Sequence, residues 1–132
     1  MPAEIPDEVP PDCTAYRLAK KSDIKPDGTP QSNCFSDKGA DDSSSCYMSV
    51  YFSDEMQEAG KSVSDLQKAW GPGYIVLAFS VADLREQGER LWRDPIDEFP
   101  GHGACKRADG AKRTASQERN LAKIARVAPE LL

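Results

Sequence analysis

The sequence has little or none of two features that often indicate the class of a protein, histidine and long apolar runs. It has a single histidine, His102, and no apolar run of about 18 residues, the length that predicts a transmembrane helix. Its first residues are acidic and proline-rich, unlike the basic start and apolar stretch of a secretory signal peptide. We therefore expect a cytoplasmic protein without membrane contact, and we expect its four cysteines to be reduced thiols.

The chain also lacks the short sequence motifs that are typical of nucleotide-binding proteins and of enzymes with a serine nucleophile. It contains no glycine-rich phosphate loop, no dinucleotide-binding fingerprint and no nucleophile elbow. The H-x-x-C spacing of His102 and Cys105 suits zinc, but Cys34 and Cys46, the remaining candidate ligands, do not form a close pair. We predict no cofactor and no metal site.

Length and charge favour one small acidic domain. A chain of 132 residues predicts a single domain, here residues 13–132, after a flexible, proline-rich acidic leader at residues 1–12. A long polar loop is expected at about residues 21–45. The net charge is -5, yet residues 106–132 hold seven basic and three acidic side chains, so the C-terminal part is basic.

Hydrophobic periodicity predicts an α+β fold. Strands are expected at residues 14–20, 43–52, 74–81, 89–94 and 103–108, with the apolar run at residues 74–81 as a central strand. Helices are expected at residues 53–70 in one or two pieces, at residues 80–88, and from Thr114 to a stop at Pro129. We predict a mixed sheet of about four or five strands with two to four helices and the C-terminal helix packed on the sheet.

Helix starts are signalled by four hydroxyl side chains. Ser53, Ser62 and Ser80 are predicted N-caps, and Thr114 with Gln117 has the spacing of a capping box.

The segment DPIDEFPGHGAC, residues 94–105, is the first candidate site because it holds His102. An imidazole suits proton transfer near neutral pH, and Asp94, Asp97 and Glu98 are candidates to orient its ring, with Asp94 in the candidate catalytic set. Arg17 and Ser49, on two predicted strands, complete this set with His102 and Asp94. The alternative is a rigid turn that contains a histidine by chance, since prolines and glycines flank it.

An arginine on an early strand and a serine on a later one resemble the pattern of ADP-ribosyltransferase-like folds, here as Arg17 and Ser49. Those enzymes also need a glutamate late in the chain, and no residue here stands out for that role. The resemblance therefore implies a fold of that kind at most, and transfers no activity.

The basic C-terminal part supplies the candidate binding residues. Arg119, Lys123 and Arg126 recur at i, i+4 and i+7, which predicts one face of the last helix, and Arg93 is a further candidate to hold an anion. No aromatic residue interleaves the three on an acidic chain, so nucleic acid is the least favoured partner.

Three hypotheses for function follow. The first is a small accessory or regulatory protein that binds a protein partner through the acidic segment 35–45 or the last helix. The second is a small enzyme, a transferase or hydrolase for a nucleotide-like or phosphate-bearing small-molecule substrate, with His102 as acid, base or anion ligand beside Arg17. The third is nucleic-acid binding through the last helix.

Overall fold

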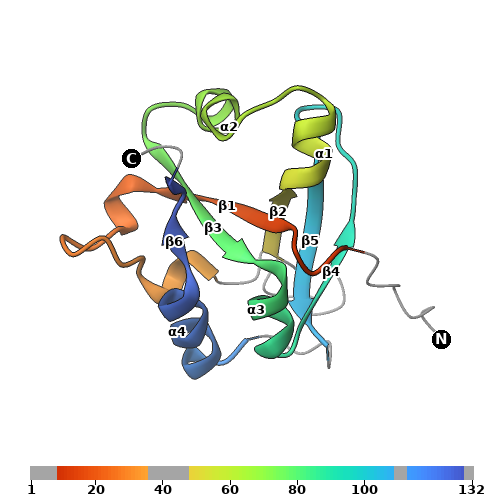
Figure 1. Cartoon of the computed structure of the whole chain (residues 1–132). Coiled ribbons are helices and arrows are strands. Elements are labelled where there is room, and N and C mark those ends of the chain that lie inside the picture. The colour runs from red at the N-terminus through yellow and green to blue at the C-terminus, as the bar shows by residue number, and fades with distance from the viewer. Residues whose placement is uncertain (1–8, 36–47, 109–112, 130–132) are drawn as a thin grey trace.

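The chain forms one antiparallel sheet of six strands, seen in Figure 1. This computed structural model describes residues 9–35, 48–108 and 113–129. The strands lie in the order β4-β5-β2-β1-β3-β6. Their bounds are β1 (Thr14–Lys20), β2 (Met48–Phe52), β3 (Tyr74–Ser80), β4 (Glu89–Arg93), β5 (His102–Arg107) and β6 (Arg126–Val127).

Helices cover both faces of the sheet, as Figure 1 shows. One face carries α1 (Ser53–Glu58) and α2 (Val63–Trp70), and the other carries α3 (Val81–Glu86), α4 (Ala115–Ile124) and a short 3-10 helix, η2 (Ser32–Phe35). A second 3-10 helix, η1 (Lys21–Asp23), follows β1. In the described part of the chain, no helix is long and apolar enough to cross a bilayer.

Strand alternation divides the apolar residues between two cores. On β2, Met48, Val50 and Phe52 enter the core under α3 and α4, whereas Tyr51 enters the core under α1 and α2. Successive residues of a strand point to opposite faces, so a strand covered on both sides needs apolar residues in both registers. The strand predicted at residues 43–52 is confirmed over Met48–Phe52.

The α+β fold with a single sheet is confirmed, and the sheet differs in detail from the prediction. It has six strands rather than four or five, and every described pairing is antiparallel. β6 has only two residues, too few to produce a periodic pattern. β3 is an interior strand, paired with β1 and β6, and its residues enter both cores, as predicted for residues 74–81. Of the predicted polar loop at residues 21–45, residues 21–35 are described and contain η1 and η2. Residues 36–45 of that loop, which form nearly all of the acidic segment, lie outside the described residues, as do residues 1–8 of the predicted leader.

The hydroxyl residues at helix starts behave as expected in three of four cases. Ser62 and Thr114 complete capping boxes with Asp65 and Gln117, and Ser80 caps α3. Ser53 is the exception, because it is the first residue of α1 rather than its cap. Its hydroxyl accepts a hydrogen bond from the backbone N–H of Thr14 at 3.0 Å and so ties α1 to β1.

A buried ionic cluster joins β4, β5 and the start of the α4 segment. The Glu89 and Arg113 side chains are 1% and 0% exposed, and the guanidinium of Arg113 donates to both carboxylate oxygens of Glu89. Arg107 adds a second cation at 3.6 Å from Glu89, and Arg113 also donates to the Cys105 carbonyl oxygen at 3.1 Å. Burial raises the pKa of the Cys105 thiol well above its ordinary value.

Candidate functional site

His102 is the first residue of β5 and is only 6% exposed. Its Nδ1 lies 2.6 Å from the backbone oxygen of Asp94, and the Asp94 N–H donates to the His102 carbonyl oxygen at 3.0 Å. Because a carbonyl oxygen only accepts, Nδ1 carries a proton in this arrangement. The carboxylate of Asp94 is farther away, with Oδ2 at 4.0 Å from Nδ1. His102 and Asp94 therefore close the loop between β4 and β5.

The residues around His102 fit this architectural role. Its ring packs edge-on against Tyr51, with centroids 5.3 Å apart. Gly101 has a φ of +90°, which favours glycine, and a Cβ on Gly103 would come within 2.1 Å of the Phe52 ring. The rigid-turn interpretation of this segment agrees with the geometry, while the predicted proton-transfer role of His102 stays a prediction.

Arg93 is held by two carboxylates of α1. It contacts Asp54 at 2.7 Å and Glu55 at 2.5 Å, and its guanidinium lies 5.5 Å from the centre of the Phe52 ring. The hydrogen bond from Arg93 lowers the pKa of the Asp54 carboxyl. The structure thus shows Arg93 joining β4 to α1, and its predicted role as an anion ligand stays a prediction.

The basic face predicted for the last helix is shorter than expected. Arg119 and Lys123 are exposed on α4, but α4 ends at Ile124 and Arg126 belongs to β6. Ala125 is extended, and the chain then pairs with β3, so backbone hydrogen bonds to a strand replace a further helical turn. The prediction that all three share one helix face is wrong.

The sheet opens between β1 and β2. These strands pair only at Ala15 with Phe52 and at Tyr16 with Tyr51, whereas β1 follows β3 through seven paired positions. On the other side, β2 continues along β5 (Figure 1). The next position on β1, Arg17, therefore lies where the ladder between β1 and β2 has ended.

Arg17 bridges this opening. Its Nη1 donates to the Ser49 carbonyl oxygen at 3.0 Å, and its Nε donates to the Cys34 carbonyl oxygen at 3.2 Å. Arg17 is 8% exposed. A side chain thus satisfies a β2 carbonyl beyond the end of the ladder, and it places a positive charge within the sheet. The structure brings together two of the predicted site residues, Arg17 and Ser49.

A cavity of about 250 Å³ lies at this opening, which we call the split-sheet cavity. The lining residues are Arg17, Leu18, Ser49, Tyr51, Trp70 and Tyr74. Trp70 and Tyr74 flank the turn that joins α2 to β3, in which Gly71 has a φ of +113° and accepts a hydrogen bond from the Tyr74 N–H. Gln67 also donates to the Tyr74 carbonyl oxygen at 2.9 Å, which fastens the start of β3 to α2.

Tyr51 connects the cavity to the aromatic core. It is 4% exposed, and its ring meets those of Trp70, Phe99 and His102 edge-on at centroid distances of 5.3, 5.8 and 5.3 Å. Burial, with a smaller contribution from Glu98, raises the pKa of Tyr51 to about 12 against the opposing effect of a nearby arginine. Its hydroxyl therefore remains a proton donor at neutral pH. His102 packs behind this ring and does not line the cavity among the described residues.

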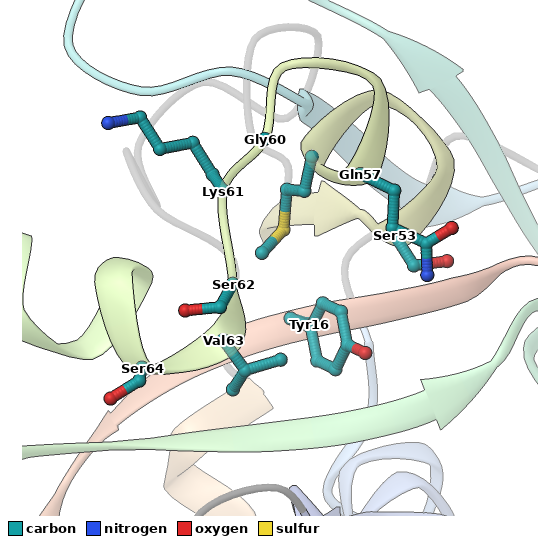
Figure 2. Close-up of a pocket in the computed structure, with 9 residues that line it drawn as sticks. Tyr16, Ser53, Gln57, Gly60, Lys61, Ser62, Val63 and Ser64 are labelled. Carbon is teal, nitrogen blue, oxygen red and sulfur yellow. The ribbon is translucent and has the colours of Figure 1, made fainter.

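Three further cavities are present among the described residues: one of about 290 Å³ between α1 and the loop that joins β4 to β5, and two that share Tyr16 in their lining. The larger of these two, about 500 Å³, is shown in Figure 2 and lies between α1, the start of α2 and Tyr16. Figure 2 shows Tyr16 and Val63 turned toward it and Lys61 extending away from it. The second, about 400 Å³, is lined by Tyr16 and by the exposed Arg126 near β6. Neither has a buried charge in its described lining.

Within the described ranges, no three His, Cys, Asp or Glu side chains are grouped so that they could hold a metal ion. Comparison of the chain with protein-family models, curated proteins and solved structures found no match. The case for function therefore depends on the site itself.

Sequence reasoning missed three of the residues that matter most at the cavity, Tyr51, Trp70 and Tyr74. A signal was present for two of them, since aromatic residues flank the turn formed by Gly71, Pro72 and Gly73. Tyr51 was read only as part of a strand pattern, and its position beside Arg17 depends on a strand pairing between distant segments.

Proposed function

We propose that this chain binds a small anionic molecule in the split-sheet cavity. The observation that carries the proposal is Arg17, a nearly buried guanidinium at the place where two strands separate. The binding part of the predicted enzyme function, in which Arg17 holds an anion, agrees best with this geometry.

Electrostatics supports an anion rather than a neutral or cationic ligand. Arg17 donates to two backbone carbonyl oxygens that orient its guanidinium at the cavity, and an arginine side chain stays protonated at neutral pH. A carboxylate or phosphate beside Arg17 would make a charge-assisted hydrogen bond in a site with limited access to water. The protonated Tyr51 hydroxyl, at the same cavity, is a second donor for such a group.

Binding is the step that these residues support most directly, and a transferase or hydrolase reaction on a phosphate-bearing substrate would build on it. Protein-partner and nucleic-acid binding have less support. The acidic segment lies mostly outside the described residues, and Arg126 lies apart from Arg119 and Lys123. The described cysteines, Cys13, Cys34 and Cys105, are free and buried, in keeping with a reducing, cytoplasmic location.

Isothermal titration calorimetry of the full chain with phosphate, acetate and benzoate tests the proposal. We expect at least one anion to bind one-to-one with a dissociation constant of about 1 mM, because small probes have a low ceiling of affinity. Tyr51→Phe removes one donor and should weaken binding. Arg17→Met should abolish it, with folding checked by circular dichroism.

The matched control is Arg119→Met, which removes an equal charge from the exposed face of α4. It should leave the affinity unchanged. The proposal fails if none of the three anions binds. It also fails if Arg119→Met weakens binding as much as Tyr51→Phe does.

A further inference from the structure

We infer that the split-sheet cavity selects a planar aromatic acid, a single ring that carries a carboxylate. This inference rests on the proposed function and adds the class of ligand. Three aromatic side chains line the cavity together with Arg17, so the same small space combines aromatic rings with a positive charge. None of the three other cavities in the described part of the chain has this combination.

Two of these three aromatic side chains, Tyr51 and Trp70, are held in place by ring contacts before any ligand arrives. Tyr51 and Trp70 meet at an interplanar angle of 67°, and Phe99 meets both, at 88° and 70°. In an edge-on pair, the ring that contributes its edge keeps its own faces uncovered by that partner. A planar ligand can therefore stack without displacing a ring, and the site loses little side-chain entropy when it binds.

Polar groups at the cavity are able to hydrogen-bond a carboxylate. No described residue hydrogen-bonds the hydroxyl of Tyr51 or of Ser49, although Tyr51 is buried. Among the described residues only Arg107 Nε is a buried polar side-chain atom without a hydrogen-bond partner, so the Tyr51 oxygen is accessible to water or to a ligand at the cavity. A carboxylate beside Arg17 would accept a hydrogen bond from Tyr51 while its ring lies against Trp70 or Tyr74.

The size of the cavity sets the extent of the ligand. At about 250 Å³ it is somewhat smaller than the roughly 300–1,000 Å³ typical of sites for drug-sized molecules. A ring with one acidic substituent suits this space, whereas a whole nucleotide would leave much of its structure outside. We therefore assign the aromatic acid, rather than a nucleotide, as the preferred ligand.

Fluorescence of Trp70 provides a local test, because the chain has only one other tryptophan, Trp92 on β4. In a Trp92→Phe background, Trp70 is the sole tryptophan reporter. The probes are benzoate, cyclohexanecarboxylate, which has the same charge without a planar ring, and adenosine monophosphate. We expect benzoate to change the emission of Trp70 saturably and to bind about tenfold more tightly than cyclohexanecarboxylate in calorimetry.

A second variant separates ring recognition from charge recognition. Tyr74→Leu removes a wall of the cavity and should reduce the preference for benzoate over cyclohexanecarboxylate, while Arg119→Met should preserve it. A preference below about twofold in the parent chain, or tighter binding of adenosine monophosphate, would overturn this inference alone. If no acid binds at all, the proposed function fails with it.

Discussion

A substitution at Glu89 tests whether the buried ionic cluster of Glu89, Arg107 and Arg113 stabilises the fold. Replacing Glu89 with glutamine keeps the shape of the side chain but removes the carboxylate that Arg113 and Arg107 share. The side chains of Glu89 and Arg113 are almost fully buried, so the variant removes a buried carboxylate from direct contact with a buried guanidinium.

The expected loss is large. Removing one partner of a buried ion pair costs about 3–5 kcal/mol. Unfolding entropy of about 2.1 cal/mol/K per residue gives about 0.28 kcal/mol/K for this 132-residue chain, so each kcal/mol lowers Tm by about 3.6 °C. Glu89→Gln should therefore lower Tm by about 11–18 °C.

Differential scanning calorimetry measures this shift, and Asp54→Asn is the control. Asp54 also pairs with an arginine, Arg93, but its side chain is 40% exposed and Glu55 remains as a partner. Exposed pairs contribute about 0.2–1 kcal/mol, so this control should lower Tm by less than about 4 °C. If Glu89→Gln shifts Tm no more than Asp54→Asn does, the buried cluster does not stabilise the fold as argued.

Three further predictions concern the same sheet and its helices. Gly103→Ala should lower the free energy of unfolding by about 1–3 kcal/mol or more in urea titrations, because its Cβ would clash with Phe52, whereas Gly73→Ala, with no atom within 4 Å, should be neutral or slightly stabilising. Thr114→Ala should cost about 0.5–2 kcal/mol by the same assay through loss of the α4 capping box, and Thr114→Ser should restore most of it. Tyr51 should ionise near pH 12 in an ultraviolet absorbance titration compared with Tyr51→Phe. Because an unfolded tyrosine ionises near pH 10, the contribution of Tyr51 to stability should be lost as pH rises from about 10 to 12.

Local chemistry made much of the fold predictable. The capping boxes at Ser62 and Thr114 depend on residues three positions apart, so their signals are complete within one helical turn. The strand at Met48–Phe52 was equally predictable from local sequence, and neighbours such as Val50 and Tyr51 point to opposite faces because they are consecutive in a strand.

Features that depend on distant partners could not be read in this way. Ser53 has the residue type of a cap, but its hydroxyl is used by Thr14 on a strand 39 residues away. Likewise, the pattern of the last helix continues past Ile124, yet pairing of Arg126 with Ala78 on β3 ends the helix early.

The candidate site shows the same division. Arg17 and Ser49 were chosen for their chemistry, and the structure places them in contact through a backbone carbonyl. His102 was a candidate because it is the single histidine of the chain, and in the structure it hydrogen-bonds Asp94 and so closes the loop between β4 and β5. The cavity forms because β1 and β2 separate after two paired positions. Beyond that point β1 pairs with β3 and β2 pairs with β5, and these pairings join segments that are distant in the sequence.

The most direct test of the central claim is a map of backbone amide chemical shifts in the full chain as benzoate is added. We expect the largest shifts to cluster around Arg17, Ser49, Trp70 and Tyr74, with those on α4 unchanged. Largest shifts around Tyr16 or on α4, or no saturable shifts at all, would contradict the claim that this protein binds an anion where its sheet divides.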